Sequence, residues 1–435
     1  MEETVKILAK TTLVIFLMAL SVEFTFLAGQ SSAQVLLHQS DLVYQGAFRV
    51  PTGKLGANQA VGFAFGGAAL AYNPVNNSLF IVGHVYDQMT AEIGIPQIVN
   101  STNLSNLKTA TVLQQFTDAL EGKLDSVDPG EVNGFRIGGQ LVLNNQLYLS
   151  DYTYYDGDYT QVTSHFARLL NLSTKGQLKG PYRVGTAGEG FVSGYMTQIP
   201  TEWQSLFGGP ALTGNCCLSI ISRTSMGPAL SVFNPADIGV KNPVPATQVL
   251  GYPSGHPTLG PWEGNGTAHP IYNMSTEVKG LVFPQGTRTV LFFGRTGLGV
   301  PCYGTGDDCN DPADGSKGTH SYPYGYYAWA YDANDLLAVK NNQKQPWDVV
   351  PYASWSFDLP FAGNNPYIWG AAYDPATQRV FLSQASGDAY GLDPLPVIHV
   401  FKVSVTVSGD TAPPPQLQQS SEYDDEYLEQ RDMKL

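Results

Sequence analysis

The sequence is poor in charge and has no excess of basic residues. Only 14% of its 435 residues are Lys, Arg, Asp or Glu, and the net charge is −14. No positive stripe is therefore present to neutralise phosphates, which argues against nucleic-acid binding. The sequence also lacks a G-x-S-x-G elbow, a Walker loop, a dinucleotide fingerprint and the H-x-H or H-E-x-x-H spacing of common metal enzymes.

Long apolar runs are missing too, apart from one near the N-terminus. Lys6 and Lys10 precede the run TTLVIFLMALSV (11–22), and Ser31 to Ala33 are small residues suited to cleavage. This arrangement predicts a signal peptide over residues 1–33, and hence a secreted protein, extracellular or periplasmic, with no membrane span once mature. An uncleaved membrane anchor is the alternative, but the run is short for a spanning helix.

Glycine (46), proline (29) and tyrosine (24) are abundant, a mixture that favours many short strands joined by turns. One pattern recurs along the chain: a strand rich in small residues, a turn, and then an apolar strand. FAFGGAALAYNPVNNSLFIVGH (63–84) and YIWGAAYDPATQRVFLSQAS (367–386) are its clearest copies. Three further copies lie at 135–152, 191–214 and 279–297.

A third apolar strand follows each copy, and a fourth follows all but the last, at 111–118, 181–186, 247–253 and 353–360. DLVYQGAFRVP (41–51) has the right character to supply the missing strand. The sequence therefore predicts an all-β fold, a β-propeller of five four-stranded blades over residues 41–408, closed by the N-terminal strand. A pair of β-sandwiches or a ring of six or seven blades is the alternative. Residues 409–435, proline-rich and then acidic, are predicted to form a flexible tail.

Loop lengths distinguish the two faces of such a ring. The turns between first and second strands share one face, while the loops between second and third strands share the other with the crossings between blades. The first set is short, whereas the second set includes the long segments 84–92, 119–133, 151–164, 254–275, 297–325 and 386–395. Long loops on a rigid scaffold are the usual place for binding and catalysis, so we expect the functional site on the loop-rich face.

Only four cysteines are present, and all fall in loops predicted for this face. Cys216 and Cys217 are adjacent, so their Cα atoms lie about 3.8 Å apart, below the usual disulfide range, and pairing with the neighbouring blade stays open. Four cysteines allow three connectivities. We favour a bond between Cys302 and Cys309, which closes part of the longest loop, with a bond between Cys216 and Cys217 as the second.

The C-terminal third of the chain carries a family resemblance. The stretches TVLFFGRTGLG (289–299), GDDCNDPADGSKGTHSYPYGYYAWAYDA (306–333) and GAAYDPATQRVFLSQ (370–384) resemble a group of exported bacterial proteins of unassigned function. The resemblance implies an exported bacterial β-propeller. It supplies no catalytic residues.

Acidic residues crowd the loop DDCNDPAD (307–314). Closely spaced oxygen ligands of the kind that Ca²⁺ prefers are offered by Asp307, Asp308, Asn310, Asp311 and Asp314, although the spacing is not that of an EF-hand loop. Calcium is therefore the candidate cofactor. A solvated loop of turn-forming Asp and Asn residues is the alternative.

Aromatic and acidic side chains alternate in DYTYYDGDY (151–159). Flat rings stack on the apolar faces of sugars and carboxylates accept hydrogen bonds from hydroxyls, so this composition favours glycan recognition. The candidate ligand-binding residues on this and the neighbouring loops are Asp151, Tyr154, Tyr155, Trp262, Tyr322 and Tyr324. A tyrosine-rich turn that packs on itself is the alternative.

Carboxylates also precede several of the predicted inner strands. Glu131, Glu189 and Glu263 are expected to converge on the mouth of the central channel, where acid–base glycoside chemistry needs paired carboxyl groups. Turn carboxylates that only stabilise local structure are the alternative. His165 and His399 lie in third strands and are expected to be structural, whereas four histidines are expected near the loop-rich face: His84, His256, His269 and His320.

Three hypotheses follow from these patterns. The first is a secreted propeller that binds a polar ligand, a glycan, on its loop-rich face. The second is a glycoside hydrolase or lyase that uses the carboxylates at the channel mouth. The third is a cell-surface or extracellular assembly protein whose partners include further copies of itself.

Overall fold

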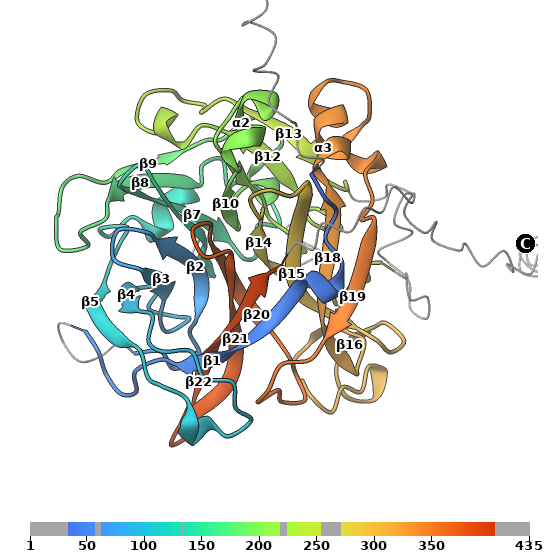
Figure 1. The fold of residues 1–435 in the computed structure, drawn as a ribbon. Coiled ribbons are helices and arrows are strands. Elements are labelled where there is room, and N and C mark those ends of the chain that lie inside the picture. Colours follow the sequence, from blue (N-terminus) through green and yellow to red (C-terminus); the bar gives the residue numbers. More distant parts are fainter. Residues whose placement is uncertain (1–33, 57–61, 132–133, 218–223, 254–270, 405–435) are drawn as a thin grey trace, which may run out of the picture.

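The computed structural model describes residues 34–56, 62–131, 134–217, 224–253 and 271–404. Five four-stranded antiparallel sheets form the blades of a ring, which confirms the predicted five-bladed β-propeller (Figure 1). Several predicted features lie outside the described residues: the signal peptide, the acidic tail, Trp262, Glu263, His256 and His269.

Each blade is a meander of neighbouring strands, numbered here from the inner to the outer edge. Blade 1 comprises β2 (Ala68–Asn73), β3 (Ser78–Val82), β4 (Thr90–Gly94) and β5 (Thr111–Thr117). Blade 2 comprises β6 (Phe135–Leu143), β7 (Gln146–Thr153), β8 (His165–Leu169) and β9 (Lys179–Tyr182). Blade 3 comprises β10 (Met196–Gln198), β11 (Ala211–Thr213), β12 (Leu230–Phe233) and β13 (Ala246–Leu250).

Blades 4 and 5 complete the ring. Blade 4 comprises β14 (Glu277–Val282), β15 (Thr289–Gly297), β18 (Tyr324–Asp332) and β19 (Ala353–Phe357). A small separate hairpin, β16 (Cys302–Gly304) with β17 (Gly318–His320), is inserted between its second and third strands. Blade 5 comprises β20 (Ile368–Asp374), β21 (Arg379–Tyr390), β22 (Asp393–Val403) and, from the other end of the chain, β1 (Leu42–Arg49).

The N-terminal strand closes the ring as predicted. β1 runs antiparallel to β22, with Leu42 opposite Val403 and Arg49 opposite Val397, and Figure 1 shows the two strands side by side. The register shifts by one residue at the bulge before Gly46, whose φ is +126°. A Cβ atom at Gly46 would lie 2.4 Å from the main chain of Val99, so only glycine fits this close approach.

The hydrophobic core is divided among the blade interfaces. Five main clusters of buried side chains correspond to the five pairs of neighbouring blades. The largest joins blades 3 and 4 and contains fully buried Trp329, while the cluster between blades 5 and 1 includes Phe48 from the closing strand. Each blade therefore buries both of its faces against neighbours, which explains its nearly continuous apolar strands.

Two helices depart from the strand-and-turn pattern expected from the sequence. α2 (Thr201–Phe207) replaces the turn between β10 and β11, and α3 (Ala333–Lys340) follows β18 after an N-cap at Asp332. Both helices bury apolar residues against the cluster between blades 3 and 4. Within the described ranges, no helix is both long and apolar enough to cross a membrane.

The four cysteines pair as predicted. Cys302 is bonded to Cys309, and Cys216 to Cys217. The first bond ties β16 to the short helix that follows it, Gly306–Asp308. The disulfide therefore closes the first part of the long excursion in blade 4.

Candidate functional site

The central channel has a cavity at each end. One, of about 250 Å³, is lined by the first residues of β6, β14 and β20 and by the ends of β3 and β7. These strand ends meet the second-to-third loops and the crossings between blades, so this cavity lies on the loop-rich face. We call it the channel-mouth pocket.

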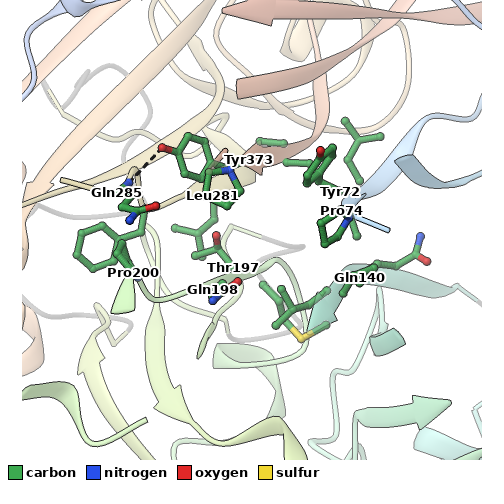
Figure 2. Close-up of a pocket in the computed structure, with 18 of the residues that line it drawn as sticks. Tyr72, Pro74, Gln140, Thr197, Gln198, Pro200, Leu281, Gln285 and Tyr373 are labelled. Carbon is green, nitrogen blue, oxygen red and sulfur yellow. Dashed lines mark hydrogen bonds between the residues drawn. The ribbon is translucent and has the colours of Figure 1, made fainter. Parts of the chain in front are cut away.

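The other cavity, of about 190 Å³, lies at the opposite ends of the inner strands. Figure 2 shows its wall, where the main-chain N–H of Gln285 donates to the Tyr373 hydroxyl at 3.2 Å. None of the described residues that line it carries a charge. The channel-mouth pocket differs because Arg136, Glu277 and Lys279 line it, and it is therefore the better candidate for recognition of a polar ligand.

The residues of three inner strands that line the channel-mouth pocket lie at equivalent positions, at or just before a bulge. β6, β14 and β20 each shift register by one residue against their second strands, as β2 also does. Up to the bulge each strand alternates, so residues two positions apart face the same side. The three bulge residues and the three residues two positions before them all line the pocket: Gly138, Lys279 and Trp369, with Arg136, Glu277 and Tyr367.

An aromatic surface forms one wall of the pocket. The rings of Tyr367 and Trp369 are stacked, with centroids 5.1 Å apart and planes within 9°. Tyr152 and Tyr154 of blade 2 line the same cavity. Such flat surfaces suit stacking against a ring-shaped ligand.

Glu277 is held by an arginine behind the pocket wall. The Arg295 guanidinium is almost fully buried and lies 3.0 Å from a Glu277 carboxylate oxygen. It also contacts the Tyr367 ring face, with its Cζ atom 3.6 Å from the centroid, and the ring of Tyr324 at 4.4 Å. Arg295 thus fixes both a carboxylate and an aromatic ring of the site.

Two further cations face the pocket from different blades. The Lys279 ammonium lies 3.3 Å from the Tyr152 hydroxyl and 5.1 Å from the centroid of that ring. Burial by itself lowers the pKa of Lys279, but the neighbouring Tyr152 and Glu277 more than offset this effect, so the pKa is raised. Arg136 is the cross-strand partner of Tyr152 and donates to the carbonyl oxygen of Phe135 at 2.8 Å.

The predicted ligand-binding residues divide into three groups. Tyr154 lines the channel-mouth pocket with half of its surface exposed, whereas Tyr155 and Tyr322 are exposed outside it. Tyr324 is buried beneath the site, where its hydroxyl donates to Asp311 at 2.5 Å. Asp151 is completely buried, and this burial raises its pKa well above the ordinary value.

The predicted catalytic carboxylates do not line the pocket in the described part of the chain. Glu131 lies in the crossing before β6. Glu189 is buried in a short helix, Glu189–Phe191, where it accepts a hydrogen bond from Ser164. Burial raises the pKa of Glu189 to about 7, although the bond from Ser164 opposes the effect. Its place is the interface between blades 2 and 3.

Among the predicted calcium ligands, Asp311 has a structural role. It is buried, and its carboxylate bonds to Tyr324, to His320 Nδ1 at 2.9 Å and to the main chain of Ala313 at 2.8 Å. Asp307, Asp308 and Asn310 are exposed. Within the described ranges, no three His, Cys, Asp or Glu side chains are arranged to hold a metal ion. Calcium binding stays a prediction.

The histidines of the third strands are buried in hydrogen-bonded networks. His165 contacts Ser164 at 2.7 Å and Thr213 at 2.9 Å. His399 contacts Tyr44 at 3.0 Å and Gln384 at 2.9 Å. Burial lowers the pKa of each imidazole to about 3, so both are neutral structural groups.

The pocket residues that the sequence analysis missed share one signal. Arg136, Glu277, Lys279, Tyr367 and Trp369 all precede or begin the glycine-containing inner strands, in FRIGG, EVKG and YIWG. In each strand the partly exposed residues alternate with buried ones. Aligning the copies on these glycines would have identified the channel-facing positions, because alternation fixes side-chain direction in a strand.

The chain matches no protein-family model and no curated protein sequence. Several solved structures are similar to it. An exo-1,5-α-L-arabinanase from a bovine ruminal metagenomic library is 9% identical over 78% of this chain and 94% of its own, with a TM-score of 0.37. A glycosyl hydrolase from Bacteroides ovatus is 11% identical over 85% and 93%, with a TM-score of 0.36.

A third similar structure comes from work on the GH130 family of mannoside phosphorylases, which contains glycoside hydrolases that target β-1,2 mannosidic linkages in Candida mannan. It is 10% identical over 85% of this chain and 96% of its own, with a TM-score of 0.40. Likenesses of this size concern the fold and carry no functional argument.

Proposed function

We propose that the protein is a carbohydrate-binding propeller whose site is the channel-mouth pocket. The observation that carries this proposal is the composition of the pocket wall, in which the stacked rings of Tyr367 and Trp369 stand beside charged side chains at equivalent bulges. A sugar ring presents apolar C–H faces that stack on aromatic rings, and hydroxyls that bond to charged groups. The pocket volume of about 250 Å³ suits one or two sugar units.

The carboxylate content of the pocket favours binding over hydrolysis. A typical glycosidase places two carboxyl groups on either side of the scissile bond. Among the described lining residues, Glu277 is the only carboxylate, and it is engaged by Arg295. Glu263, the remaining predicted catalytic residue, lies outside the described residues, so hydrolysis is an outcome that the experiment must detect.

Loss of the aromatic surface should weaken binding. We expect Trp369→Ala to raise the Kd of any bound oligosaccharide roughly tenfold, the effect of losing about 1.4 kcal/mol of stacking. The measurement is a glycan array on the wild type, followed by calorimetric titration of the best ligand with each variant. Tyr155→Ala is the matched control, because Tyr155 is an exposed aromatic residue of the neighbouring loop that does not line the pocket.

The same ligands should be incubated with the protein and the products analysed. Binding without turnover, weakened by Trp369→Ala and unchanged by Tyr155→Ala, is the expected result. Turnover that disappears in Glu277→Gln or Glu263→Gln while binding persists would identify an enzyme instead. If no glycan binds, the proposal is wrong, and self-association measured by sedimentation would test the assembly hypothesis.

A further inference from the structure

The channel-mouth pocket differs in the sign of its charge from the chain as a whole. The chain carries a net charge of −14, yet the pocket is lined by two cations and one carboxylate. The carboxylate, Glu277, is neutralised by Arg295 at 3.0 Å. The remaining charge of the wall is therefore positive.

Neither lining cation forms an ion pair within 4.0 Å in the described part of the chain, although Glu277 lies near enough to Lys279 to raise its pKa. Among the ion pairs of the described residues, none includes Arg136 or Lys279. Their side-chain hydrogen bonds go to neutral oxygens, from Arg136 to the Phe135 carbonyl and from Lys279 to the Tyr152 hydroxyl. Cations that outnumber the carboxylates in a partly enclosed pocket attract an anion, because the surroundings screen their charge less than bulk water does.

Both cations line the same pocket as Tyr152. Tyr152 is the cross-strand partner of Arg136, and side chains of such a pair lie on the same face of the sheet. Lys279 reaches across from blade 4 to the hydroxyl of the same ring. Arg136, whose guanidinium carbon lies 5.8 Å from the Tyr86 ring centroid, and Lys279 therefore line one pocket, although blades 2 and 4 are not neighbours in the ring.

From this juxtaposition we propose that the pocket selects glycans that carry a carboxylate, that is, uronic-acid units. Arg136 and Lys279 hold the sugar carboxylate beside Tyr152, and the Trp369 ring stacks on the sugar ring. Arginine suits a carboxylate because its N–H groups match the two oxygens. The inference rests on the proposed carbohydrate-binding function and specifies the ligand of that site.

The test compares each acidic oligosaccharide with its own neutral form. The probes are trisaccharides of galacturonate, glucuronate, mannuronate and guluronate, and the same four after chemical reduction of the carboxyl groups. Calorimetric titration at low salt is expected to show at least one uronate that binds tenfold or more tightly than its reduced form. Raising the salt concentration should shrink this ratio, because the added interaction is between charges.

Substitutions test whether Arg136 and Lys279 cause the preference for the acidic form. Lys279→Met and Arg136→Gln should each weaken binding of the acidic form much more than binding of the neutral form, and so remove most of the ratio between the two Kd values. Lys108→Met is the control, since Lys108 is an exposed lysine outside the pocket lining. Trp369→Ala should weaken both forms equally. Thermal melting of each variant verifies that the fold is retained.

The outcomes separate this inference from the function on which it rests. Equal binding of acidic and neutral forms would overturn the uronate preference and leave carbohydrate binding intact. No binding of either form would contradict the proposed function itself. Acetate or inorganic phosphate alone binding as tightly as the uronate trisaccharides would show a plain anion site and would overturn the inference.

Discussion

At the scale of single residues, Glu189 is a carboxyl group whose ionisation affects the stability of the fold. Its hydrogen bond from Ser164 begins a buried chain that continues through His165 to Thr213, and so links blade 2 to blade 3. Burial raises the pKa of Glu189 to about 7 from an ordinary value of 4.5. The folded protein thus holds this proton more tightly than the unfolded chain does.

The stabilisation is complete below about pH 4.5 and is lost as pH rises through about 7. The loss amounts to about 3 kcal/mol, at about 1.4 kcal/mol for each pKa unit. Glu189→Gln cannot ionise, so we expect it to be more stable than the wild type above pH 7 and to lack this pH dependence. Urea unfolding of both proteins between pH 4 and 9 measures the difference, with exposed Asp158→Asn as the control for net charge. A difference that stays constant with pH would contradict the assignment.

At the scale of elements, the excursion between β15 and β18 is organised around Asp311. Burial by itself raises the pKa of Asp311. The hydrogen bonds of its carboxylate to Tyr324, the main chain and His320 outweigh this effect, so the pKa is lowered. Its contribution to stability is present at neutral pH and is lost as pH falls through its depressed pKa. These hydrogen bonds explain why an acidic residue stands at position 311, whether or not the loop binds calcium.

We expect Asp311→Asn to lower the free energy of unfolding by about 2 kcal/mol, both in calcium and in EDTA, because it weakens hydrogen bonds to a charged group. Asp307→Asn in the same loop is the control, since Asp307 is exposed. Denaturant unfolding in the two buffers distinguishes the roles. A destabilisation by Asp311→Asn that vanishes in EDTA would mean that Asp311 acts through a bound metal.

The elements also show why the fold was more predictable than the site. Repeated strand–turn–strand patterns specify the blades, since each blade buries both faces in the same way. The sequence predicted two strands and a turn over residues 191–214, but the helix α2 lies there between the two strands. Burial of Trp203 and Phe207 against blade 4 stabilises this helix. Glu189 was predicted at the channel mouth, but the direction of a side chain in a crossing depends on packing between blades. On β14, by contrast, local alternation already determines that Glu277 and Lys279 face the channel.

At the scale of the whole molecule, stability depends on ring closure by β1. Phe48 and Val50 at its end are completely buried, and burial of each such side chain contributes roughly 1.5–3 kcal/mol. A chain that starts at Leu55 should therefore lose its cooperative unfolding transition. The comparison is a chain that starts at Gln34 and keeps every described residue, with both followed by circular dichroism during heating. Unchanged melting of the shorter chain would show that β1 is dispensable.

The pairing of β1 with β22 also determines when the ring of blades can close during folding. Tyr44 and His399 make contact although they are 355 positions apart in the chain. During synthesis β1 emerges first, whereas its partner strand emerges after every other blade. Blades 1 to 4 are built from local strands and can form in turn, but the fifth stays incomplete until the ribosome has made residues 393–403. Closure is thus the last step in assembling the ring, and an interrupted chain exposes an open strand edge to its neighbours.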